Sequence, residues 1–244
     1  MTYKGKRTLV ITICLAIGLT ARLIYCIKYP VMPRDSYIYY DIIMAWNETG
    51  QLSHGENGTI PPLALFLFSI PSIHFGLDVM KGAVLINILS GMAFLHFCIM
   101  IMDDVRNNLI WDFMVGILAA THPTLLQFSC QMTREMTYLL FVILAVFFFI
   151  HQRDRPVLPY MAMAGFFSSA AFLCRHEALE LFPVIMSASL FFPLRTSCIA
   201  RTKMIGTYLL SGGAAFFLIL EKIDIPLSYF SVYYGEFLTK TIFR

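Results

Sequence analysis

Residues 136–151 read MTYLLFVILAVFFFIH, so most of the side chains are Leu, Phe, Val or Ile. The run stops at residues 151–155, whose sequence HQRDR reads as a compact charged turn. Apolar side chains on every side of a segment predict a helix in contact with lipid. A helix needs about 20 residues to cross a bilayer. We still expect this shorter run to span the membrane because so little of it is polar.

Runs of the same kind recur along the whole chain. Of the 244 residues, 58% are apolar and 14% are charged, and the mean hydropathy is +0.71. A soluble domain has about 25% charged residues, so we expect an all-α polytopic membrane helix bundle with about seven transmembrane helices. The predicted spans are residues 8–28, 82–102, 109–126, 136–151, 157–173, 178–194 and 204–220.

The apolar stretch 62–76 is too short to cross a bilayer. It follows Pro61-Pro62, and proline is favoured in the first turn of a helix. We therefore predict a juxtamembrane helix within an outer loop, residues 29–81. The whole chain then reads as one membrane module, residues 1–220, with a short outer tail, residues 221–244, and it is open whether the chain continued further.

Charge and cysteine usage exclude some functions. A net charge of +3 provides no electrostatic footprint for nucleic acid, and the six cysteines are scattered without a CxxC pair, so we predict no metal site. Lysines and arginines divide almost evenly between the two sides, although those on the predicted inner side lie in shorter loops. We expect a multi-pass integral membrane protein of a bacterial inner membrane, or of the endoplasmic reticulum in a eukaryote, in contact with membrane lipids.

Two acids on the predicted outer face are candidates for catalysis. Asp35 follows the first span, and it is either a solvated helix cap or a general base that takes a proton from an acceptor. Glu135 opens the fourth span, where an acid stabilises the helix dipole, and a charge beside so apolar a run also raises the expectation of function.

Basic residues on the same face are candidates for binding a substrate. Arg134 adjoins Glu135, and Arg175, His176 and Glu177 form a cluster between the fifth and sixth spans. A guanidinium provides a fork of donors that suits a phosphate group. Arg22, near the outer end of the first span, either serves the same purpose or extends its side chain to the surface.

The order of these features resembles the GT-C membrane glycosyltransferases. The likeness is to the protein O-mannosyltransferase branch, glycosyltransferase family 39, and to the lipid A aminoarabinose transferase, and it covers about residues 8–195. The matching features are Arg22-Leu23, then Asp35, Tyr39, Ala45 and Gly50, then Pro61-Pro62-Leu63 through Phe75-Gly76, then Pro123 and Glu135, and finally Arg175 and Pro183.

This resemblance implies transfer of a sugar from a polyprenyl-phosphate donor to a lipid, glycan or protein acceptor on the periplasmic or luminal face. Asp35 would act as the base and Glu135 would orient the reactants, while Arg22, Arg134 or Arg175 would stabilise the departing phosphate. Tyr39, His176 and Glu177 would complete the binding site.

The resemblance also bears on cofactors and partners. The resemblance implies no certain cofactor, and a divalent cation remains an option. Members of the family often have a second acid that could assist such a metal, and Ser36 stands in its place here. The chain ends after the predicted seventh span, so a second chain that completes the donor site is also allowed for.

Two alternatives of other classes stay open. A transporter would carry ionisable residues inside its spans, and Asp112 and Glu180 are the candidates. A non-catalytic membrane subunit, or a fragment of a glycosyltransferase, is the other alternative.

Overall fold

The computed structural model describes residues 3–30, 32–49, 60–151, 157–191 and 198–223. All of the regular structure in these ranges is helical, as predicted, and none of it is strand. The predicted outer tail lies outside the described residues except for residues 221–223, which belong to the last helix. The helices are α1 Tyr3–Lys28, α2 Arg34–Thr49, α3 Pro62–Phe75, α4 Val79–Arg106, α5 Leu109–Thr121, α6 Pro123–Cys130, α7 Glu135–His151, α8 Val157–Cys174, the 3₁₀ helix η2 His176–Glu180, α9 Leu181–Phe191 and α10 Cys198–Ile223.

Three of these helices are long and apolar enough to cross a membrane: α1, α4 and α10. The pair α5 and α6 adds a fourth candidate if it counts as one bent span. Helices α3, α7 and α8 are apolar but shorter, with 10–17 residues in their apolar parts. The chain is therefore a helical membrane protein, and the predicted count of seven spans is not confirmed.

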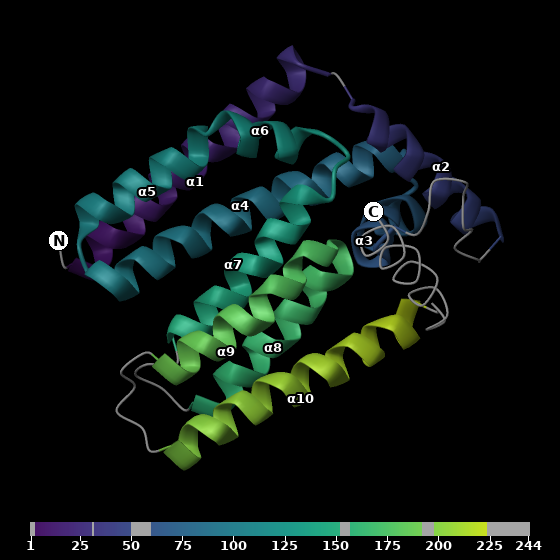
Figure 1. Ribbon diagram of the computed structural model, residues 1–244. Coiled ribbons are helices and arrows are strands. Elements are labelled where there is room, and N and C mark those ends of the chain that lie inside the picture. Colours follow the sequence, from purple (N-terminus) through teal and green to yellow (C-terminus); the bar gives the residue numbers. More distant parts are fainter. Residues whose placement is uncertain (1–2, 31, 50–59, 152–156, 192–197, 224–244) are drawn as a thin grey trace, which may run out of the picture.

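Helix α4 lies between two groups of helices (Figure 1). On one side α1 and α5 run side by side, and a buried cluster that includes Cys14, Leu95, Ile99 and Ala120 joins them to α4. On the other side α7, α8, α9 and α10 pack together around a cluster that includes Met161 and Tyr208. Both groups are thus anchored on one central helix.

An ion pair and a histidine–aspartate hydrogen bond fasten these groups to the last turns of α4. Arg7 of α1 lies 2.9 Å from Asp103, measured between Nη1 and Oδ2. His151, the last residue of α7, lies 2.6 Å from the neighbouring Asp104, measured between Nδ1 and Oδ2. Successive helical residues point in different directions, so adjacent acids reach neighbours on different sides of α4.

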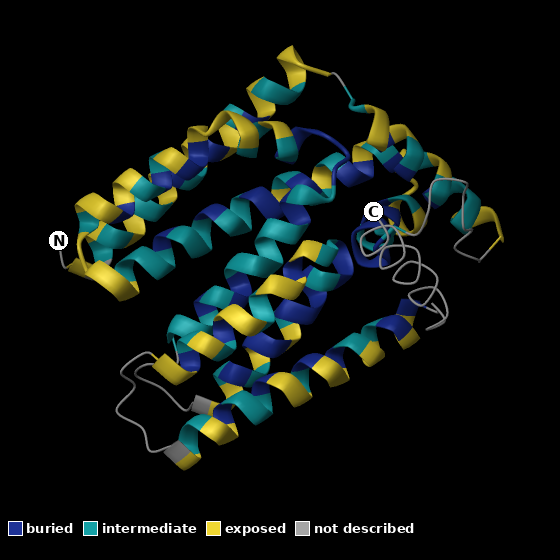
Figure 2. Ribbon diagram, viewed as in Figure 1, coloured by how far each residue is buried: buried dark blue, intermediate teal, exposed yellow. Residues whose placement is uncertain are grey.

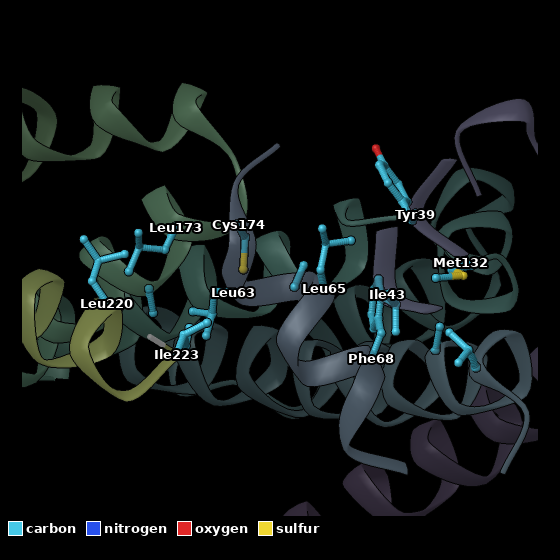
Figure 3. Packing of buried hydrophobic residues seen from close by; sticks show 14 residues of the cluster. Tyr39, Ile43, Leu63, Leu65, Phe68, Met132, Leu173, Cys174, Leu220 and Ile223 are labelled. Carbon is cyan, nitrogen blue, oxygen red and sulfur yellow. The ribbon is translucent and has the colours of Figure 1, made fainter. Parts of the chain in front are cut away.

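The short helix α3 is buried by the helices around it. Leu63, Leu65 and Phe68 of α3 are almost fully buried among side chains of α2, α4, α8 and α10 (Figure 3). The helix begins after Pro61 and ends at Gly76, whose φ of 64° lies in the left-handed region that glycine tolerates. The predicted short helix at 62–76 is therefore confirmed, and it helps to build the core of this end of the molecule.

The predicted span 109–126 is broken in the structure. Helix α5 ends at Thr121, and α6 begins at Pro123 with a bend of 53°. Proline has no amide hydrogen to continue the helix, and its ring restricts the preceding residue to extended angles, as seen at His122 with φ −60° and ψ 122°.

The long helices α1 and α10 carry many exposed residues (Figure 2), and large apolar side chains are among them. Exposed large side chains include Leu19 and Leu23 on α1 and Leu210, Phe217 and Leu218 on α10. Contiguous exposed apolar surface of this kind is what lipid tails cover in a membrane protein.

Helices α8 and α10 approach each other closely at small residues. A Cβ atom added to Gly165 would lie 2.3 Å from the backbone oxygen of Tyr208. Ser169 also donates a hydrogen bond to the carbonyl of Gly212 at 2.7 Å. The backbones therefore touch without an intervening side chain, as in other membrane helix pairs.

Candidate functional site

A buried asparagine holds the segment that carries Arg134 and Glu135. Residues 131–134 connect α6 to α7, and Asn87 of α4 donates hydrogen bonds to the carbonyls of Gln131 and Thr133, at 2.7 and 2.8 Å. The hydroxyl of Thr137 donates to Asn87 Oδ1 at 3.1 Å. This set of bonds fixes the start of α7 against the central helix.

Helix α2 is tied to the same segment. The hydroxyl of Ser36 donates to the carbonyl of Met132 at 2.9 Å. One turn further along α2, the phenol oxygen of Tyr39 accepts from Arg134 Nε at 3.0 Å, and the Arg134 guanidinium carbon lies 5.2 Å from the centre of the Tyr39 ring. Burial is the main cause that raises the pKa of Tyr39, so the phenol stays protonated at neutral pH.

Arg134 has no acidic partner in the described part of the chain. None of the carboxylates there lies within 4.0 Å of its guanidinium nitrogens, and only its Nε makes a hydrogen bond. The side chain is partly exposed, and its two Nη groups make no hydrogen bond with the described residues. An arginine in this condition is suited to an anion with two acceptor oxygens.

Arg175 joins α7 to the η2 segment. Its Nη1 donates to Glu135 Oε1 at 3.0 Å, while its Nε and Nη2 donate to the two oxygens of Glu177 at 3.2 and 2.8 Å. The guanidinium carbon also lies 5.7 Å from the centre of the Tyr138 ring. The hydrogen bonds from Arg175 lower the pKa of Glu177 to about 2 and raise the pKa of Arg175.

His176 follows Arg175 in the chain, and its imidazole is affected by the charges of Arg134 and Glu177. Burial, together with the positive charge of Arg134, lowers the pKa of His176 to about 4, although the Glu177 carboxylate acts in the opposite direction. Its ring packs edge-on against Phe172, with 5.7 Å between the ring centres. The imidazole is therefore neutral at neutral pH.

Asp35 lies in the first turn of α2 with its side chain exposed. Within the described ranges, its carboxylate makes neither a hydrogen bond nor an ion pair. It lies one residue before Ser36 and within electrostatic range of Tyr39. The structure thus brings Asp35 to the same end of the bundle as Arg134 and Glu135, with its oxygens uncommitted.

Arg22 does not join this group. Its guanidinium is fully buried between α1, α4 and α6, where it donates to Ser129 Oγ at 3.1 Å and to the carbonyls of Gly18 and Gly91 at 3.0 and 3.3 Å. The side chain holds three helices together and has no surface on which a substrate could rest, so we give Arg22 a structural role.

Three residues that contribute to this site were not anticipated from the sequence: Ser36, Asn87 and Tyr138. Ser36 and Asn87 bind the 131–134 segment, and Tyr138 stacks under Arg175. An asparagine in the middle of an apolar run is itself a signal, because a buried amide requires partners. Ser36 and Tyr138 carry no such signal in the sequence.

The residues present do not suit a divalent cation. In the part of the chain that the structure describes, no group of three or more His, Cys, Asp or Glu side chains could hold a metal ion. Ser36, which stands in place of the second acid, is buried, and its hydroxyl donates a hydrogen bond to the carbonyl of Met132. The carboxylate of Glu135 is paired with Arg175. We therefore derive no metal-assisted step.

The sequence was also compared with known proteins. No protein-family model matches the chain, and no curated protein matches it. Any functional conclusion for this molecule therefore depends on the contacts described above.

Proposed function

We propose that this chain is a membrane glycosyltransferase that moves a sugar from a polyprenyl-phosphate donor to a lipid, glycan or protein acceptor. The face involved is the periplasmic or luminal one, at the end of the bundle that carries α2, the start of α7 and η2. The proposal is supported by the presence at this end of the bundle of Asp35, whose carboxylate makes no bond with the described residues, and of Arg134, whose two Nη groups make none. These residues come from segments about 100 residues apart in the sequence, and Ser36 and Tyr39 join the two segments.

The observation that carries the proposal is the uncommitted guanidinium of Arg134. Its Nε is held by Tyr39 at 3.0 Å, which orients the side chain and leaves the two Nη groups for a ligand. A lipid phosphate presents paired oxygens at the membrane surface and matches this geometry. Arg175, in contrast, is already satisfied by Glu135 and Glu177.

The chemistry follows from these assignments. Asp35 takes the proton from an acceptor hydroxyl or amine, and the acceptor atom forms a bond to the anomeric carbon. The bond from that carbon to the phosphate oxygen breaks, and the phosphate leaves with the electron pair, stabilised by Arg134. Glu135 acts as a positioning residue, because its carboxylate is engaged by Arg175.

The test is transfer of labelled sugar in membranes. The wild type is supplied with polyprenyl-phosphate donors that carry mannose, glucose or aminoarabinose, and covalent products are measured. We expect Asp35→Asn to lower transfer by about 10²- to 10⁴-fold and Arg134→Ala by about 10²- to 10³-fold. Arg134→Lys should fall between Arg134→Ala and the wild type, because it keeps the charge and loses the fork.

Asp41→Asn is the matched control, since Asp41 is an exposed acid on the same helix. It should transfer at the wild-type rate, with equal membrane abundance of every variant. Undiminished transfer by Asp35→Asn removes Asp35 as the base. A wild type that forms no product with any donor overturns the proposal, and substrate uptake into vesicles without covalent product favours a transporter instead.

A further inference from the structure

A buried acid lies at the other end of the bundle, away from the candidate site. Asp112 belongs to the first turn of α5, which begins where α4 has just ended (Figure 1). Its side chain is fully buried, and both carboxylate oxygens lack a hydrogen-bond partner among the described residues. Such a side chain is rare, because buried polar groups are almost always paired.

Helix geometry shows what Asp112 faces. Gly116 lies one turn further along α5, and a Cβ atom there would be 2.6 Å from Cys14 Sγ of α1 and 3.0 Å from Ile99 Cδ1 of α4. Residues four apart share a helix face, so Asp112 also faces α1 and α4. Since α4 runs toward this end, the residue one turn beyond Ile99 is Asp103.

The charged and titratable groups around Asp112 come from two helices. Helix α1 contributes Arg7, Tyr3 and Cys14, and α4 contributes Asp103, which repels the Asp112 carboxylate while Arg7 attracts it. Helix α6, which also packs against α5, contains no acid, lysine or arginine.

Asp103 takes most of the donors available in this cluster. It accepts from Tyr3 Oη at 3.1 Å and pairs with Arg7 Nη1 at 2.9 Å. The Nη2 of Arg7 lies 3.0 Å from Met100 Sδ, and its Nε is buried without a partner in the described ranges. The cluster therefore holds one donor without an acceptor and one carboxylate without a donor.

An ionised carboxylate that is buried and without a hydrogen bond is too costly to persist, and such groups take up a proton instead. We propose that Asp112 is a proton-binding site, neutral in the arrangement seen here, and that on losing its proton it recruits Arg7 from Asp103. Binding converts the carboxylate and one proton into a carboxylic acid, with no other bond made or broken. The site is independent of sugar transfer, because it shares no residue with the cluster around Arg134.

Infrared spectroscopy tests the site directly. The full chain is prepared in lipid bilayers with carbon-13 in the carboxyl groups of its aspartates, and spectra are recorded from about pH 5 to about pH 10, where buried carboxyls titrate. We expect a labelled carboxylic-acid band that persists at neutral pH and disappears on alkalinisation. Asp112→Asn, which mimics the neutral acid in shape, should lack the band.

Three further variants make the result specific. Asp104→Asn removes the adjacent acid, which is bonded to His151, and should keep the band. Asp112→Glu keeps an acid but should lose the labelled band. Asp103→Asn releases Arg7, which can then stabilise the ionised form of Asp112. In this variant the carboxylic-acid band of Asp112 should therefore disappear at a lower pH than in the wild type. Absence of the band from the wild type, or its survival in Asp112→Asn, overturns the proton site, and an unchanged titration in Asp103→Asn overturns the exchange of Arg7.

Discussion

A single imidazole makes the stability of this protein depend on pH. The folded-state pKa of His176 is about 4, while an unperturbed histidine has a pKa of about 6.5. Between these values the unfolded chain binds more protons at this residue than the folded chain, so the contribution of His176 to stability falls as the pH drops from about 6.5 to about 4. Below that range the lowered pKa of Glu177 removes further stability as the pH falls toward about 2. His176→Gln should show a smaller loss of melting temperature between these two pH values than the wild type.

The measurement is thermal unfolding in detergent at both pH values. His74→Gln is the matched control, because the side chain of His74 is exposed at the end of α3. It should keep the wild-type pH dependence. An equal loss in His176→Gln and in the wild type would show that other groups cause the acid sensitivity.

Individual residues differ in how far the sequence reveals them. The pairing of Glu135 with Arg175 and the meeting of Tyr39 with Arg134 agree with the expectation that these polar clusters converge. The burial of Arg22 could not be predicted from the sequence. It depends on how closely α4 and α6 pack against α1, and the residues next to Arg22 in the chain carry no information about that packing. Whether Asp35 or Arg134 acts in catalysis stays a prediction.

At the scale of elements, the contact of α8 with α10 depends on the absence of side chains. Gly165→Ala would place a Cβ atom 2.3 Å from the backbone of Tyr208, which cannot move without shifting α10. We expect a destabilisation of about 1–3 kcal/mol from overpacking. The measurement is the melting temperature in detergent, together with retention of the folded fraction on size exclusion.

Gly206→Ala is the control within α10, because no atom lies within 4 Å of a Cβ added there. Alanine has the better helix propensity by about 1 kcal/mol, so this variant should be neutral or more stable. Equal effects of the two substitutions would show that the α8–α10 contact is looser than described.

The element boundaries show what periodicity can and cannot predict. The start of α7 at Glu135 and the limits of α3 follow from a change in composition and from prolines, and both were predictable. The span expected at 178–194 begins instead as the 3₁₀ helix η2 and continues as the 11-residue α9. The sequence carries a local signal of this change, because Glu180 interrupts the apolar run and Pro183 lies in the first turn of α9, where proline is favoured.

At the scale of the whole molecule, the two charged clusters should lie on opposite sides of the membrane. Arg7 and Asp103 meet at one end of α4, while Arg134 and Arg175 lie near its other end. Single cysteines introduced at Lys6 and at Glu177, both exposed positions, should react with a membrane-impermeant maleimide from opposite sides.

The readout is labelling of right-side-out and inverted vesicles, with the wild type as the blank for native thiols. Cysteine at Asp35 should label from the same side as cysteine at Glu177. Labelling of positions 35 and 177 from opposite sides would separate the proposed base from the cluster of Arg134, Arg175 and Glu177, and the proposed reaction would be ruled out.

The number of spans is the part of the whole that composition alone could not establish. The apolar runs correctly predicted a membrane protein with an all-helical fold. They also predicted about seven spans, whereas three helices, or four with the bent pair, are long and apolar enough to cross a membrane in the described part of the chain. Helix α3 shows why an apolar segment need not span the membrane, because its apolar side chains are covered by other helices of the protein and not by lipid. Composition cannot distinguish these two kinds of apolar neighbour.

The fastening of both helix groups to α4 has a consequence for large ligands. Asp103 and Asp104 hold the last turn of α4, and the bonds of Arg22 to Gly91 and of Asn87 to the 131–134 segment hold its middle and first half. The two groups cannot part without breaking buried bonds. Helix α2 is attached to that segment through the hydroxyls of Ser36 and Tyr39, and its Tyr39 and Ile43 are buried against α3 and α4. Under the proposed function, a bulky polyprenyl tail or acceptor that tilts α2 outward would have to break both hydrogen bonds and part of this packing.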